Sequence, residues 1–132
     1  MKLYGYWRSS CSWRVRIALH YKGLSYVHRS VDLVADGGQQ FDMGYRVLNP
    51  MAQVPTLALS SGEHLTQSVA ILEYLEEVHP NPALLPSDVR ERAHVRQLVE
   101  VINSGIQPLQ NLAVLQRLRG QSSLDPKGWA RA

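Results

Sequence analysis

The chain has 132 residues, a formal net charge of +3 and a hydrophobic content of 45%, which is typical of a soluble globular protein and excludes a disordered one. Its basic residues form no run broad enough to bind nucleic acid, and no apolar stretch approaches the roughly 18 residues that a membrane span requires. With one cysteine, Cys11, and no paired Cys/His spacing, the sequence predicts a cytoplasmic protein without an internal disulfide or a metal site.

Short strands and helices alternate over the first 79 residues. Four β-prone segments are predicted as strands, at residues 2–7, 24–31, 56–59 and 64–66. Helical spacing predicts helices between them, at residues 10–22, 39–46 and 68–78. The order βαβαββα combines a parallel crossover with an antiparallel hairpin and a covering helix. It predicts an α/β domain with a thioredoxin-like fold, although other small α/β folds share the alternation.

Prolines interrupt the chain after this domain and mark the start of another. Residues 80–86 contain three prolines, which is typical of an interdomain linker. Ser87 and Asp88 are suited to cap a helix, which Gly105 and Pro108 are expected to weaken or kink. We therefore expect a first domain over 1–79, a linker over 80–86 and a partial all-helical domain over 87–132, ending in a loop (120–128) and the start of another helix (129–132).

The junction between the first strand and the first helix is the most informative candidate site. Ser9, Ser10 and Cys11 lie where the helix begins, and the N–H groups and dipole of a helix start favour an anion such as a thiolate. Ser9 and Ser10 are each expected either to donate a hydrogen bond to a sulfur anion or to cap the helix, or to do both. Cys11 is either a nucleophilic thiolate or a small residue that shapes the pocket.

Several separated blocks of sequence resemble one family. The block from Ser9 to Leu19, SSCSWRVRIAL, is similar to the signature of the zeta-class glutathione transferases, the maleylacetoacetate isomerases. Further blocks with the same resemblance are 36–40, 48–57, 67–68 and 105–112. The related maleylpyruvate isomerases look less similar around residues 9–11. Family members have a longer helical domain than residues 87–132 provide, so we expect this chain to be truncated within that domain.

The resemblance implies that glutathione is the cofactor and that its sulfur lies at the first helix. Ser9 would stabilise the thiolate, with Ser10 and Cys11 beside it as further catalytic candidates. Val54 and Pro55 would form a cis-proline loop whose backbone pairs with the cysteinyl part of glutathione. From the residues alone, an ordinary trans proline entering a strand is equally compatible.

Two further blocks are implied to bind the ends of glutathione. Gln67 and Ser68 begin a helix and would bind the γ-glutamyl carboxylate, although Ser68 could also cap that helix. Gln40 would contact the glycyl end, or could be a solvated helix residue. Residues expected to face an acidic small-molecule substrate are Arg8, Gln107, Asn111, Leu112 and Ala113, with a surface salt bridge (Arg8) and helix packing (the others) as the alternatives.

The implied activity is the cis–trans isomerisation of maleylacetoacetate to fumarylacetoacetate in tyrosine and phenylalanine breakdown, by a homodimer with transferase side activity. Glutathione would add to the double bond, permit its rotation and leave unchanged. Maleylpyruvate isomerisation, glutathione thioltransfer through Cys11, and a non-catalytic glutathione-binding or dimerising module remain alternatives.

Overall fold

A computed structural model describes residues 1–119 of the chain, which divides into two compact units, Met1–Leu84 and the part from Leu85 onward. Residues 80–84 of the proline-rich segment thus belong to the first unit. Among the described residues, no helix is long and apolar enough to cross a membrane, and no cluster of His, Cys, Asp or Glu is suited to hold a metal ion.

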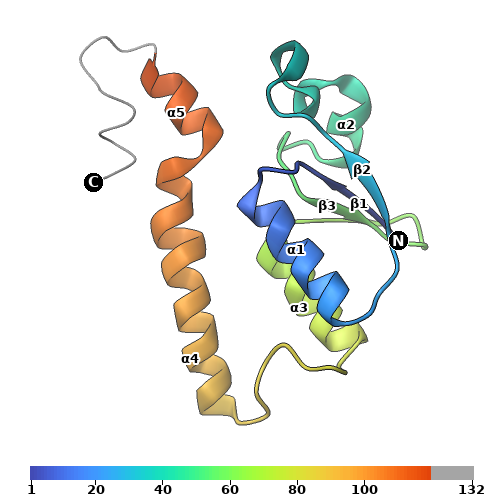
Figure 1. Cartoon of the computed structure of the whole chain (residues 1–132), viewed down its shortest axis with the longest axis vertical. Helices are drawn as coiled ribbons and strands as arrows, with labels where there is room; N and C mark the ends of the chain where they lie inside the picture. The colour runs from blue at the N-terminus through green and yellow to red at the C-terminus, as the bar shows by residue number, and fades with distance from the viewer. Residues whose placement is uncertain (120–132) are drawn as a thin grey trace. The chain divides into compact units, whose positions relative to one another are not determined.

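The first unit is built on a four-stranded mixed sheet (Figure 1). Its strands are β1 (Lys2–Gly5), β2 (Val27–Ser30), β3 (Thr56–Ala58) and β4 (His64–Thr66), in the order β2-β1-β3-β4. The strand β1 runs parallel to β2 and antiparallel to β3, which is antiparallel to β4. With the helices described below, this arrangement confirms the predicted thioredoxin-like α/β domain.

Three strands are shorter than the sequence predicted, β3 by one residue only. In β1 and β2, a side chain or a helix end takes over the hydrogen bonds of residues that were predicted as strand. Tyr6 leaves β1, and its N–H donates to the buried hydroxyl of Ser12 at 3.2 Å. Leu24 is not part of β2, because its N–H donates to the Leu19 carbonyl at 2.9 Å and closes the preceding helix. Gly23, with φ +66°, makes this turn, so the helix ends where the sequence predicted.

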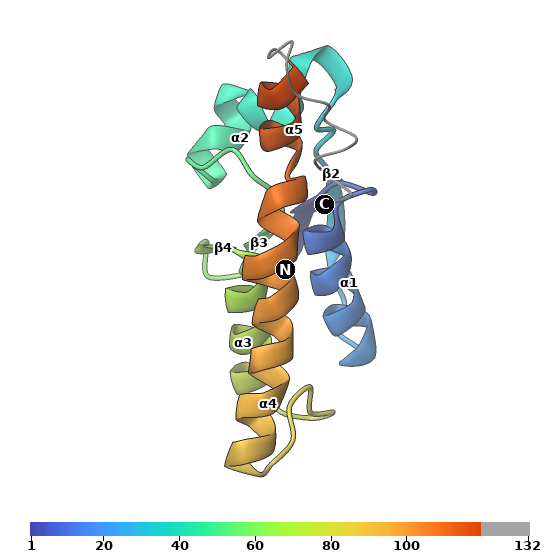
Figure 2. The same cartoon turned by 90° about the vertical axis from the view of Figure 1, so that its left-hand side faces the viewer.

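The helices α1 (Ser10–Tyr21) and α3 (Ser68–Val78) pack side by side (Figures 1 and 2). Leu3 pairs with Leu57 across β1 and β3, so both side chains point to one face of the sheet. They form a buried core with residues of the two helices, namely Val15, Ala18, Leu19, Ile71 and Leu75. Each helix thus buries its apolar stripe against this face.

The short helix α2 (Met43–Leu48) covers the opposite face of the sheet. Tyr4 and Thr56 are the next pair in the same register, and both contact Tyr45 of α2. The ring centres of Tyr4 and Tyr45 are 6.1 Å apart. The hydroxyls of Tyr45 and Thr56 form a hydrogen bond of 2.9 Å. The predicted helix over 39–46 is instead a 3-10 turn at Gln39–Phe41 followed by α2. Asp42, which has extended backbone, separates the two.

A buried lysine joins the end of α1 to the end of α3. The Lys22 side chain is fully buried and lies 2.7 Å from the carboxylate of Glu76. Its ammonium also donates to the carbonyls of His79 and Pro82, at 2.6 and 2.9 Å. Glu76 in turn accepts from the Leu84 N–H at 2.9 Å. All three donors of the ammonium are therefore used, as a buried charge requires.

The second unit begins with α4 (Val89–Glu100), which Asp88 caps through its side chain, as the sequence predicted. A π-helical turn at Val101–Ile106 contains Gly105, and a 3-10 turn at Gln107–Gln110 contains Pro108. The α-helical hydrogen bonding therefore changes where these two residues were expected to weaken it, before α5 (Leu112–Arg119). The predicted loop at 120–128 and helix at 129–132 lie outside the described residues.

We predict that Lys22→Met lowers the free energy of unfolding by about 3–5 kcal/mol, because it leaves the Glu76 carboxylate partly buried without its cation. Urea denaturation followed by circular dichroism measures the change. The exposed Lys2→Met on β1 is the matched control and should change stability by less than about 0.5 kcal/mol. A loss below about 1 kcal/mol in the Lys22 variant would contradict a stabilising role for the pair.

Candidate functional site

The register of the sheet brings the predicted glutathione-binding loops to one edge. Tyr4 of β1 pairs with Thr56 of β3, which pairs with Thr66 of β4. The segment after β1, the segment before β3 and the segment after β4 all leave the sheet at this edge. They contain Ser9, the 54–55 loop and the start of α3 respectively. Residues far apart in sequence are therefore neighbours because of strand pairing.

Ser9 is the N-cap of α1, with extended backbone at φ −78° and ψ 117°. Its Oγ accepts a hydrogen bond from the Ser12 N–H at 3.1 Å. Because this bond uses a lone pair of the oxygen, the hydroxyl hydrogen is left for a second, outward partner. Ser10 is the exposed first residue of the helix, so Ser10 as the cap is wrong. Cys11 follows it in the first turn, half-buried and in no disulfide.

The start of α3 is joined to α1 by a hydrogen bond that the sequence did not predict. Ser68 is buried, and its Oγ accepts from Nη1 of Arg14 at 2.6 Å. The N-cap position of α3 is occupied by Gln67, whose φ of +65° is rare for a residue with a side chain. Ser68 as the helix cap is therefore wrong.

Arg14 is a site residue that the sequence analysis did not select. Helical periodicity places it one turn after Ser10 and Cys11, and that spacing was the available signal. Arg16, two residues further on, instead stacks on the ring of Trp13 at 4.4 Å. The two arginines thus point in different directions, as two-residue spacing on a helix predicts.

The peptide bond between Val54 and Pro55 is cis, as the resemblance implied. Two buried polar side chains form hydrogen bonds with the loop that precedes it. The carbonyl of Gln53 accepts from the Tyr45 hydroxyl at 2.5 Å and from the Asn49 amide at 2.7 Å. Burial raises the pKa of Tyr45, so its hydroxyl remains a donor at neutral pH. Neither side chain was predicted as part of a site.

Gln40 is placed at the same edge by the loop that follows β2. Gln39 anchors the loop, since its N–H donates to the Asp32 carbonyl at 2.7 Å and its amide oxygen accepts from the Asp32 N–H at 2.8 Å. Gln40 itself is buried, so the expectation of a solvated helix residue is wrong. Its Oε1 is buried without a hydrogen-bond partner among the described residues, which is uncommon for a buried acceptor.

The residues expected to face the substrate are divided between the two units. Arg8 is in the first unit, exposed, with its guanidinium 5.6 Å from the centre of the Trp7 ring. The others lie in the second unit, where Asn111 accepts from the Ala113 N–H at 2.9 Å and so caps α5. This capping role was not predicted. The residues of the second unit that were predicted to face the substrate are Gln107, Asn111, Leu112 and Ala113.

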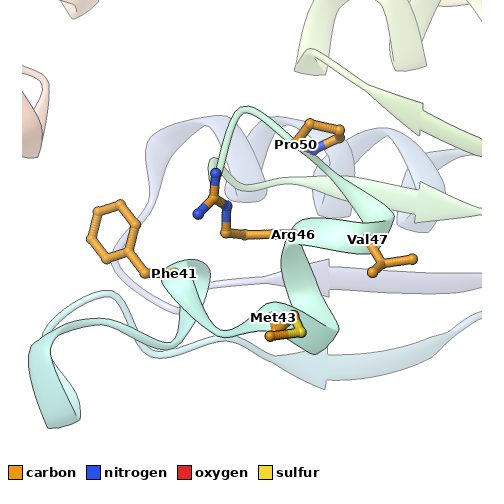
Figure 3. A pocket seen from close by; sticks show the side chains of 5 residues that line it. All are labelled: Phe41, Met43, Arg46, Val47 and Pro50. Atoms are coloured by element: carbon orange, nitrogen blue, oxygen red, sulfur yellow. The ribbon is translucent and has the colours of Figure 1, made fainter.

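A separate hollow of about 510 Å³ lies on α2 and the segments on either side of it (Figure 3). Apolar side chains and one guanidinium line it. None of its lining residues was predicted to bind glutathione or substrate: they are Phe41, Met43, Arg46, Val47 and Pro50.

The four-stranded mixed sheet, its covering helices and the cis-proline loop place the first unit in the class of thioredoxin-like domains. Within this class, residues 8–78 match the family model described as "Glutathione S-transferase, N-terminal domain". The match covers more than half of the chain, which therefore belongs to the glutathione S-transferase family.

Similar proteins of known sequence are named maleylacetoacetate isomerase. The rat protein is 55% identical over 129 residues, which cover 98% of this chain and 58% of the relative. The Dictyostelium discoideum protein is 53% identical over 131 residues, 98% of this chain and 59% of the relative. The chain thus spans somewhat less than 60% of the length of these relatives.

Solved structures show the same similarity. A maleylacetoacetate isomerase from Anaeromyxobacter dehalogenans with bound glutathione has a TM-score of 0.84 at 52% identity, covering 98% of this chain and 61% of that one. One from Methylobacterium extorquens with bound malonate and glutathione has a TM-score of 0.92 at 39% identity, covering 99% and 62%.

We predict that Gly38→Ala weakens glutathione binding about tenfold, because a Cβ at this position would lie 2.5–2.8 Å from the Gln40 amide and displace it. Gly37→Ala is the matched control, since this residue also has a positive φ but open space around a Cβ. Calorimetric titration of both variants measures the difference. Equal losses in the two would show that backbone strain, and not the Gln40 amide, determines affinity.

Proposed function

We propose that this chain provides the glutathione site of a glutathione-dependent isomerase that converts maleylacetoacetate to fumarylacetoacetate. The observation that carries the proposal is the capping hydroxyl of Ser9, placed at the same sheet edge as the cis Val54–Pro55 loop and the start of α3. The similarity to proteins named maleylacetoacetate isomerase supports the choice of substrate.

The three parts of glutathione each have a matching group on the chain. The γ-glutamyl carboxylate fits the N-terminus of α3, where Arg14 donates to Ser68 Oγ and leaves the Ser68 hydroxyl hydrogen for an anion. The cysteinyl backbone fits the N–H and carbonyl of Val54. The unpaired Gln40 Oε1 fits the N–H of the glycyl part.

When bound, glutathione supplies a thiol that adds reversibly to the carbon–carbon double bond, which can then rotate. The residues of the chain make this thiol reactive. Ser9 donates a hydrogen bond at the position of the sulfur, which stabilises the thiolate over the thiol and lowers its pKa. The N-terminal dipole of α1 acts in the same direction. Ser10 and Cys11 border this position.

The substrate side of the site is proposed from Arg8 of the first unit, and the substrate role of the residues of the second unit stays a prediction. A guanidinium at Arg8 matches the carboxylates of an acidic substrate. Maleylpyruvate is the second candidate substrate, because a maleylpyruvate isomerase of the zeta class has a TM-score of 0.91 at 39% identity, covering 98% of this chain and 61% of that one. Relative turnover of the two acids decides between them. A cytoplasmic homodimer is proposed on the family resemblance.

We predict that Ser9→Ala lowers glutathione-dependent isomerisation roughly 10- to 100-fold, the effect of losing a hydrogen bond to a charged group. The ascending, acidic limb of the pH–rate profile should move to higher pH, because the thiol pKa rises when the thiolate loses a donor. Rates of maleylacetoacetate conversion by the purified chain, measured from pH 6 to about 9, provide both readouts.

Cys11→Ala is the control and should retain isomerisation. The opposite pattern, an active Ser9 variant and an inactive Cys11 variant, would favour thioltransfer through Cys11. Glutathione binding without turnover by the unaltered chain would favour a binding module.

A further inference from the structure

The inference concerns the side chains beneath the cis-proline loop, and it rests on the proposed glutathione site. Gln53 precedes Val54, and its side chain is exposed. The contacts of Gln53 with buried side chains are made by its main chain. Two donors, the Tyr45 hydroxyl and the Asn49 amide, meet at its carbonyl oxygen, at 2.5 and 2.7 Å.

The Tyr45 hydroxyl is bonded on both sides of the Val54–Pro55 dipeptide. Its single hydrogen goes to the Gln53 carbonyl, so the bond of 2.9 Å to Thr56 has the Thr56 hydroxyl as donor and the Tyr45 oxygen as acceptor. One phenol thus links the residue before Val54 to the residue after Pro55. The peptide groups of Val54 and Pro55 therefore lie between two residues that bond to the same rigid side chain.

Asn49 fixes the opposite end of the same loop. Its Oδ1 accepts from the Met51 N–H at 3.0 Å, and its carbonyl accepts from the Ala52 N–H at 2.9 Å. Ala52 has φ +53°, a conformation that a residue with a side chain adopts only when its surroundings determine it. The loop is therefore held by hydrogen bonds at residues 49, 51, 52, 53 and 56.

The network is also shielded from water. Tyr45, Asn49 and Thr56 are 6%, 2% and 0% exposed, so solvent has little access to the side chains that make these hydrogen bonds. The outer side of α2 takes no part in the network, since the hollow in Figure 3 is lined by other residues of this helix and its flanks.

We infer that Tyr45 and Asn49 are positioning residues for glutathione, which fix the direction of the Val54 N–H and carbonyl before the ligand arrives. A backbone edge that is already ordered binds an extended peptide without a further loss of entropy. Without the Tyr45 hydroxyl, the edge must be ordered by the ligand itself.

Tyr45→Phe tests this inference, because it keeps the ring against Tyr4 and removes only the hydroxyl. We expect glutathione to bind about tenfold more weakly, measured by calorimetry on the whole chain. Tyr4→Phe, which removes the hydroxyl of the neighbouring ring, is the matched control and should bind as the unaltered chain does. Thr56→Val, which removes the other partner of the Tyr45 hydroxyl, should weaken binding in the same direction.

A second ligand separates positioning from general destabilisation. Glutathione methylated on its cysteinyl nitrogen has no N–H to give to Val54, so the unaltered chain should bind it more weakly than glutathione. Tyr45→Phe should lose much less on methylation, because its Val54 edge is already poorly placed.

Equal losses on methylation in both proteins would overturn the inference, as would unchanged glutathione affinity in Tyr45→Phe. If the unaltered chain binds no glutathione, the proposed function fails together with the inference. If it binds and only the Tyr45 result is negative, the inference fails alone.

Discussion

The pairing of β1 with β3 is the constraint on which both the core and the candidate site depend. Its register sets Leu3 opposite Leu57 on the face covered by α1 and α3, and Tyr4 opposite Thr56 on the face covered by α2. A shift of one residue would exchange these faces, because side chains alternate along a strand. It would place Leu57 under α2 and separate Thr56 from Tyr45, so the apolar core and the cis-proline loop would be lost together.

The same register places the N-termini of α1 and α3 at one edge of the sheet. Polar side chains join the two helices near both of their ends. At the C-terminal ends, Lys22 of α1 binds Glu76 and the chain after α3. At the N-terminal ends, Arg14 binds Ser68. A helix pair tied at both ends cannot slide, and this keeps the hydroxyls of Ser9 and Ser68 at a fixed separation. The polar links therefore supply geometric definition that apolar packing, which is not directional, does not.

The sequence predicted those parts of the structure that depend on local chemistry. Helical periodicity and the glycine after residue 22 located α1, and Ser9 was correctly considered as its cap. Local chemistry failed where partners are distant: Arg14 lies 54 residues from Ser68, as Lys22 does from Glu76. Tyr45 and Asn49 lie in a segment with weak helical propensity and were not selected. Polar side chains look like surface residues in a sequence, and only the fold determines which of them are buried and paired.

The buried polar side chains of the first unit differ in whether the fold itself supplies their hydrogen-bond partners. Lys22, Tyr45, Asn49 and Ser12 all have protein partners, and their loss would be felt by the fold itself. Gln40 is the exception among the described residues, because its buried Oε1 has none. An unpaired buried acceptor costs about 1–3 kcal/mol, a cost that a donor on a ligand removes. Since a ligand that binds only the folded state stabilises it, a ligand that donated a hydrogen bond to Gln40 would stabilise the fold of the first unit.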